Sequence, residues 1–96
     1  MNFGEAVENL KAGNKVARKG WNGKGMFIYL TTGSEVPYEH LRGNCKRHLF
    51  GRRTPSKEGN VVINAHIDMY AADGTVVIGW LASQTDILAD DWQVVE

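Results

Sequence analysis

The feature that most constrains the fold is the stretch from Val61 to Trp80, "VVINAHIDMYAADGTVVIGW". Apolar and polar residues alternate from Ile63 to Tyr70, which is the period of a β-strand with one face buried. Asp73-Gly74 then provides a strong hairpin signal, and Thr75 to Trp80 is the expected returning strand. This pattern predicts that the chain builds an antiparallel sheet.

A helix is expected over residues 2–12, because Phe3, Ala6, Val7 and Leu10 recur with the spacing of one helical face. The start has the signature of a capping box, since Asn2 is followed three residues later by Glu5. Gly13 is the expected stop, because glycine tolerates the left-handed conformation that follows many helices.

A second, short helix is expected after Ser83, which has Asp86 three residues further on. In this interpretation Ile87 and Leu88 face inward. The following "WQVV" is expected to close the chain as a last short strand.

Two further strands are predicted, over Val16–Arg18 and Met26–Leu30, and Thr31–Pro37 is predicted to be a loop. Residues 38–60 are expected to form a basic, irregular insertion with one helical turn around Tyr38–Leu41. The prediction is therefore a single α+β domain over residues 1–96. In it, an N-terminal helix packs on an antiparallel sheet of four to five strands, with a short C-terminal helix.

Charge is unevenly distributed along a chain that is neutral overall. All 11 Lys and Arg and five of the acidic residues lie in residues 1–60, while the other six acidic residues lie in 61–96. Overall neutrality argues against binding of a nucleic-acid polymer, which usually goes with a basic excess. The single cysteine, Cys45, fits a reducing, intracellular setting. No stretch has the length of an apolar membrane span, and the first residues do not resemble a secretory signal.

The glycine-rich segment "RKGWNGKG" raises the question of a ligand site. Its glycines, Gly20, Gly23 and Gly25, have the spacing GxxGxG, which is neither the dinucleotide fingerprint nor a P-loop. Two interpretations stay open for the backbone: an anion-binding nest or a hairpin turn. Two stay open for Trp21 as well: a platform for a nucleobase, or a side chain folded back over the sheet edge.

Other residue clusters are weaker indications of chemistry. His40, Cys45 and His48 provide three of the four ligands of a structural zinc site, and His66 would have to complete it, so no metal is expected. His66 and Asp68 lie on one strand face, where they form either an acid–base pair or simple hydrogen bonds.

Three aspartates close to the C-terminus also suggest a metal cluster. Asp86 is better explained as a helix cap, and Asp90 and Asp91 as residues on the solvated side of the helix. The absence of a convincing catalytic set or cofactor motif indicates a binding protein.

The segments "MNFGEAVENLKAGNKVARKGWNGKGMFIYL" and "DGTVVIGWLASQTDILADDW" resemble the second type of Thoeris anti-defence protein, a small phage family. The resemblance covers about the first 30 and last 30 residues and is most specific in ARKGWNGKG and SQTDILADDW. It implies a homotetramer in the cytoplasm of the infected bacterial host. That protein is a sponge: it binds an immune signal without cleaving it, so that the signal does not reach its effector.

The implied ligand is 1''–3' glycocyclic ADP-ribose, made by the TIR-domain enzyme of Thoeris immunity, in pockets between subunits. In that setting Trp21 is suited to stack on the adenine, and nearby backbone and cationic groups to hold phosphates. The ligand-binding residues expected from this resemblance are Trp21, Asn22, Gly23, Lys24, Trp80, Ser83, Gln84, Thr85 and Asp86.

Some members of this family also bind cyclic dinucleotides of CBASS immunity at a separate site. The expected position for such a second anionic ligand is the basic insertion, with Arg42, Lys46, Arg47, Arg52 and Arg53. Two other functions stay open: a cyclic-nucleotide phosphodiesterase using His66 and Asp68, and a phage structural or protein-interaction module.

Overall fold

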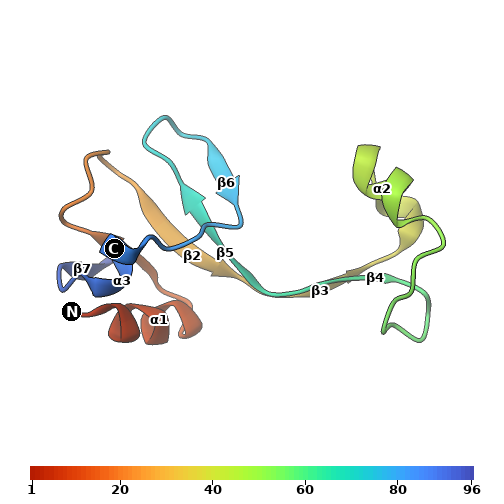
Figure 1. Ribbon diagram of the computed structural model, residues 1–96, viewed down its shortest axis with the longest axis horizontal. Helices are drawn as coiled ribbons and strands as arrows, with labels where there is room; N and C mark the ends of the chain where they lie inside the picture. The colour runs from red at the N-terminus through yellow and green to blue at the C-terminus, as the bar shows by residue number, and fades with distance from the viewer. The chain divides into compact units, whose positions relative to one another are not determined.

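The computed structural model describes residues 1–96, which fold into two compact units (Figure 1). The first unit combines the two ends of the chain, Met1–Thr31 and His66–Glu96. The second unit is the intervening segment, Thr32–Ala65. None of the helices is both long enough and apolar enough to span a lipid bilayer.

The first unit is built on a five-stranded sheet in the order β6-β5-β2-β1-β7, in which all neighbours are antiparallel. The strands are β1 (Lys15–Arg18), β2 (Phe27–Thr31), β5 (His66–Tyr70), β6 (Val76–Ile78) and β7 (Trp92–Val95). The Asp73-Gly74 turn joins β5 to β6, with Gly74 at a φ of +87°. The predicted α+β class, hairpin and closing strand are thereby confirmed.

Helix α1 (Phe3–Lys11) begins with the predicted capping box. Asn2 Oδ1 accepts the Glu5 amide at 2.8 Å, and Glu5 Oε1 accepts the Asn2 amide at 2.9 Å. Gly13 follows the helix at a φ of +92°, as its position predicts. The helix packs against β1, β2 and β7 and also contacts α3 (Gln84–Leu88).

The hydrophobic core lies between α1 and one face of the sheet. Ala6 and Leu10 of the helix meet the strand residues Val16, Ile28 and Met69. Trp92, from β7, is 2% exposed and completes the buried cluster. Burying these side chains brings the two ends of the chain together, which fixes the position of β7 beside β1.

The second unit contains a small sheet in which β3 (Ser34–Val36) pairs antiparallel with β4 (Val61–Ile63). The prediction of a loop over Thr31–Pro37 is therefore wrong. The alternating pattern from Ile63 to Tyr70 is also not one strand, since Ile63 ends β4, whereas His66–Tyr70 forms β5 in the other sheet. Three-residue strands have too few residues for a periodic signal to be read from sequence.

Two helical segments follow β3 in the second unit. The 3-10 helix η1 (Tyr38–His40) confirms the predicted helical turn. Helix α2 (Gly43–Leu49) was not expected, because none of its residues is buried and its sequence has no apolar face. Such a helix produces no hydrophobic periodicity by which it can be recognised.

The side chains of α3 are not oriented as predicted. Ile87 is 48% exposed and Leu88 is 70% exposed, so neither faces inward. Asp86 is the buried residue of this helix instead. The helix turns its carboxylate toward the sheet because Arg18 and Trp21 provide charged and polar donors there.

Candidate functional site

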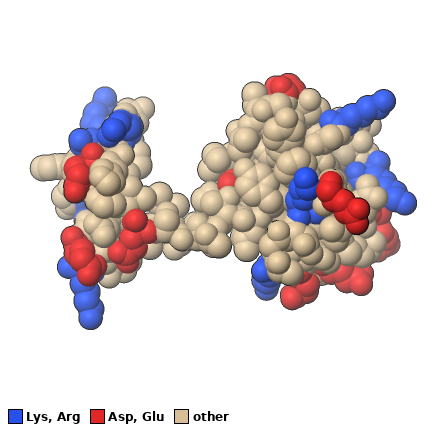
Figure 2. Space-filling view, turned by 180° about the vertical axis from the view of Figure 1, so that it is seen from behind, with Lys and Arg blue, Asp and Glu red and all other residues tan.

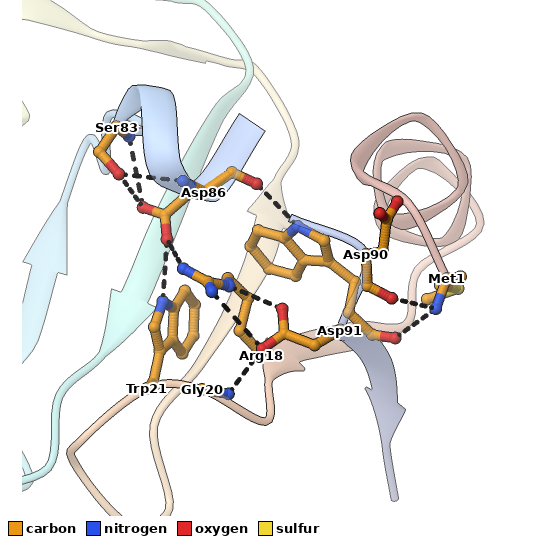
Figure 3. A network of polar contacts seen from close by, with 9 residues as sticks. Met1, Arg18, Gly20, Trp21, Ser83, Asp86, Asp90 and Asp91 are labelled. Carbon is orange, nitrogen blue, oxygen red and sulfur yellow. Dashed lines mark hydrogen bonds and ion pairs between the residues drawn. The ribbon is translucent and has the colours of Figure 1, made fainter. Parts of the chain in front are cut away.

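The polar network of the first unit centres on the side chain of Asp86 (Figure 3). One carboxylate oxygen, Oδ1, accepts from Arg18 Nη1 at 2.9 Å and from Trp21 Nε1 at 3.1 Å. The other, Oδ2, accepts from the Ser83 hydroxyl at 2.9 Å and the Ser83 amide at 3.3 Å. Ser83 Oγ also accepts the Asp86 amide, which completes the predicted capping box of α3.

Asp91 forms the second half of this network. Its Oδ1 accepts from Arg18 Nε at 2.8 Å, and its Oδ2 accepts the Gly20 amide at 2.7 Å (Figure 3). A Cβ on Gly20 would lie 2.7 Å from the same oxygen, so the absence of a side chain permits the contact. The expectation that Asp91 lies on a solvated helix side is wrong, because this residue follows α3 and its carboxylate binds Arg18 of β1.

These contacts hold both carboxylates in their ionised form. Burial disfavours the charge on Asp86, but hydrogen bonds from Arg18, Trp21 and Ser83 outweigh it, so its pKa is lowered. The Arg18 hydrogen bond is the main reason that the pKa of Asp91 is lowered, against a smaller effect of burial. The same two carboxylates raise the pKa of Arg18, Asp91 contributing most.

Three tryptophans surround the network. The Trp21 ring lies edge-on to Trp92 and Trp80, with centroid distances of 5.3 and 6.2 Å. Trp92 Nε1 donates to the Asp86 carbonyl at 2.9 Å, so both indole N–H groups reach the same residue of α3. Trp21 is only partly buried, and it packs on the core although it lies in a turn that contains Gly20, Gly23 and Gly25.

A groove of about 350 Å³ lies beside this cluster, within the first unit. It is lined by Ala17, Arg18, Lys19, Trp21, Gly23, Lys24, Gly25, Met26, Gln93 and Val95. Arg18 directs its donors to Asp86 and Asp91, which leaves the exposed Lys19 and Lys24 as the cations for an anionic ligand here. The glycine turn and β7 thus enclose an aromatic surface with positive charge at its rim.

The structure brings only part of the expected ligand set together. Trp21, Gly23 and Lys24 line the groove, while Trp80, Ser83 and Asp86 do not line it but contact Trp21 or one another. Asn22, Gln84 and Thr85 are exposed, and none of the three lines the groove. Arg18 and Asp91 were missed by sequence reasoning, because nothing local indicates a pair separated by 73 residues.

The glycines of the turn have different surroundings. A Cβ on Gly23 would collide with Met26 Sδ and lie 2.8 Å from the Ala72 Cβ. Gly25 has a φ of +76°, and a Cβ added there would meet nothing within 4 Å, so this part of the turn is open. The Gly20 amide donates to the Asp91 carboxylate. The anion bound by this amide is therefore a side chain of the same chain.

His66 and Asp68 point the same way on β5, as predicted, with Nε2 and Oδ2 3.4 Å apart. Asp68 is 2% exposed and also accepts from Thr31 Oγ1 and, at 3.0 Å, from the Gly79 amide. Burial opposes ionisation of Asp68, but these hydrogen bonds prevail and lower its pKa. The carboxylate therefore connects β2, β5 and the end of β6.

No group of three or more His, Cys, Asp or Glu side chains is placed to share a metal ion. In the second unit, a pocket of about 420 Å³ is lined by apolar and basic residues: Tyr38, Leu49, Phe50, Gly51, Arg52, Arg53, Thr54, Pro55, Gly59, Val61 and Val62. Arg52 and Arg53 of the predicted basic set are among them, but Arg42, Lys46 and Arg47 are not. Figure 2 shows basic and acidic side chains interspersed on the visible surface of each unit.

Fold and site together define a small α+β domain with a cation-rimmed groove beside a tryptophan cluster. The chain belongs to the Thoeris anti-defense 2-like family, whose model matches residues 1–95. It is 38% identical over 96 residues to Thoeris anti-defense 2 of Bacillus phage SP01, in a match that covers 99% of this chain and 94% of that protein. The match includes residues 38–60, beyond the two segments that first indicated the resemblance, and it supports a role against Thoeris defence.

Proposed function

We propose that this chain is a sponge that sequesters the TIR-derived signal 1''–3' glycocyclic ADP-ribose without cleaving it, and so blocks Thoeris immunity in the cytoplasm of the infected host. Membership of the Thoeris anti-defense 2-like family supports the anti-defence role. The observation that carries the choice of ligand is the groove in which Trp21 lies beside Lys19 and Lys24. An aromatic ring and cationic side chains that line the same groove suit a ligand that has both an adenine and a pyrophosphate.

In this proposal an aromatic residue of the groove binds the base of the ligand, and basic residues bind its phosphates. Trp21 offers an indole that is partly exposed, on which a base gains stacking energy. Lys19 and Lys24 are exposed and reach phosphates as flexible point charges. Gly25 leaves the backbone open on the same side. Asn22, Gln84 and Thr85, which lie outside the groove, contact the ligand in this proposal only where a neighbouring subunit extends the site.

Apolar surface left exposed by the first unit supports the proposed homotetramer. Val76, Val77 and Ile78 are 45–68% exposed on β6, an edge strand of the sheet. Leu81, just after this strand, is 90% exposed. An apolar edge strand without charged side chains is a template on which another chain can pair, and an exposed apolar patch commonly marks an interaction surface.

The pocket of the second unit is the proposed position for a cyclic dinucleotide of CBASS immunity. Phe50 is 75% exposed there and lies edge-on to Tyr38, with ring centroids 5.9 Å apart. Arg52 and Arg53 add positive charge to these aromatic walls. The pocket therefore combines base-stacking surface with phosphate partners, while Arg42, Lys46 and Arg47 contribute charge from outside it.

Native mass spectrometry with glycocyclic ADP-ribose, followed by heat denaturation and analysis of the released ligand, tests the proposal. We expect a tetramer with saturable ligand and recovery of the intact signal. A cleaved product would instead indicate a phosphodiesterase, in which case His66→Ala should abolish turnover. Calorimetry without heat for any cyclic nucleotide would support a structural or protein-interaction module.

A further inference from the structure

The Asp86 carboxylate has its acceptor capacity filled by its own chain. Arg18 and Trp21 donate to one oxygen and the Ser83 hydroxyl and amide to the other. A carboxylate has about four lone-pair positions, so no position is left for a ligand hydroxyl or base edge. The residue is also 9% exposed. Any effect of Asp86 on ligand binding must therefore act through the residues to which it is hydrogen-bonded.

Of these groups, Trp21 is the one whose ring forms an aromatic wall of the groove. Its backbone neighbours, Gly20 and Asn22, lie in an exposed turn, and the glycine provides no side chain to restrict the indole. The T-shaped contacts of the ring with Trp92 and Trp80 are only weakly directional. The hydrogen bond from Nε1 to Asp86 is the directional contact that selects one orientation of the ring.

We propose that Asp86 is a positioning residue, which holds the Trp21 indole in the orientation that forms the wall of the groove. Arg18 assists by donating to the same oxygen, and Asp91 fixes Arg18 through a second hydrogen bond. This inference rests on the proposed function of the groove, but the orientation of Trp21 is measurable without any ligand.

The test compares Asp86→Asn with Asp90→Asn. Asp90 is exposed and makes its polar contact in this network through its backbone carbonyl, which accepts from the Met1 amino group, so it is a matched control for charge (Figure 3). The probe is 1''–3' glycocyclic ADP-ribose, titrated by calorimetry. In parallel, the Nε1–H resonance of Trp21, assigned from its loss in Trp21→Phe, is followed by NMR.

Asp86→Asn keeps one acceptor oxygen but removes the charge that strengthens the hydrogen bond from Trp21 Nε1. We therefore expect a shifted Trp21 resonance and binding that is weaker by about tenfold, the difference between a charge-assisted and a neutral hydrogen bond. Asp90→Asn should change neither quantity. Because Trp21→Phe removes the donor and leaves a smaller aromatic ring with no hydrogen bond to Asp86, adding Asp86→Asn to it should cost no further affinity. Losses that add in the double variant, or an unmoved resonance in Asp86→Asn, would overturn the proposal.

Two further outcomes are decided by the same set of variants. If Asp86→Asn does not fold, Trp21→Phe alone should still lose about tenfold in affinity, and full affinity in that variant would refute the positioning role. If the wild-type chain binds no signal while the resonance shifts as expected, the proposed function fails and the control of Trp21 orientation by Asp86 stands.

Discussion

Arg18 donates to Asp91 from Nε at 2.8 Å across 73 residues of sequence, and the same guanidinium reaches Asp86 from Nη1 at 2.9 Å. Arginine has a rigid fork of donors, so one side chain holds two carboxylates in a defined geometry. This arrangement fixes the segment after α3 against the end of β1. Arg18 therefore contributes both to the stability of the first unit and to the wall of the groove, which it lines.

Arg18→Lys keeps the positive charge but removes the fork, so one of the two carboxylates loses its direct partner. We expect a lower urea midpoint at neutral pH than for the wild type. The matched control is Lys11→Ala, whose ammonium lies 3.8 Å from the exposed Glu8 and contributes little. Equal midpoints for both variants would show that the fork has no structural role.

The pH dependence of stability follows from the lowered pKa values of Asp86 and Asp91. Because the folded state favours the ionised carboxylates, their stabilisation is complete above the unfolded pKa of about 3.9 and is lost as pH falls through the lower folded values. Urea denaturation between about pH 6 and pH 2 should show a flatter acid dependence in Asp86→Asn/Asp91→Asn. Parallel curves for this variant and the wild type would contradict this expectation.

Gly23→Ala is expected to destabilise the first unit by about 1–3 kcal/mol, because the new Cβ collides with Met26 and approaches Ala72 to 2.8 Å. Gly4→Ala in α1 is the control, since its Cβ meets only Asn2 Oδ1 at 3.4 Å. There alanine should be neutral or stabilising, as is usual in a helix. Chemical denaturation of both variants provides the comparison, and a neutral Gly23→Ala would count against the crowded turn.

Trp21→Ala is expected to reduce affinity for glycocyclic ADP-ribose by about tenfold to a hundredfold, corresponding to one lost base stack. Calorimetry below the unfolding temperature measures the effect. Leu88→Ala, at an exposed position of α3 outside the groove, should bind as the wild type does. Unchanged affinity in a folded Trp21→Ala variant would remove this residue from the site.

The second unit provides a test of separate ligand sites. Arg52→Ala/Arg53→Ala should weaken binding of a cyclic dinucleotide by at least about tenfold, because each arginine offers a charge-assisted contact in the pocket. Binding of glycocyclic ADP-ribose to the first unit should not change. A parallel loss of both ligands would argue against two independent sites.

Local sequence patterns predicted the parts of the fold whose causes are local. Asn2 with Glu5, and Ser83 with Asp86, are capping boxes within four residues, and both are present. The surroundings of Trp21 were not predictable in the same way, because its packing partners lie far along the chain. An uncovered indole and a side chain folded back over the sheet edge both stayed open from the sequence, whereas in the structure Trp80 and Trp92 contact the ring in T-shaped arrangements.

Long-range pairing also explains what was missed in the candidate site. Asp91 looked like a solvated residue because its partner, Arg18, lies on β1. Strands β3 and β4 are three residues each and depend on each other, so neither has a periodic signal of its own. A sequence distinguishes a helix or a long hairpin well, but it does not show which carboxylate meets which cation.

The register of β2 and β5 has a consequence for how this chain tolerates change. Thr31 and His66 are directly paired, so the whole of residues 32–65 leaves and re-enters the sheet at two adjacent positions. Replacing that segment with a two-residue Asn-Gly turn would convert β2 and β5 into an ordinary hairpin without altering any other strand pairing of the five-stranded sheet. The segment is thus attached to the sheet at a single pair of neighbouring positions, so its length can change while the strand order of the sheet that carries it stays the same.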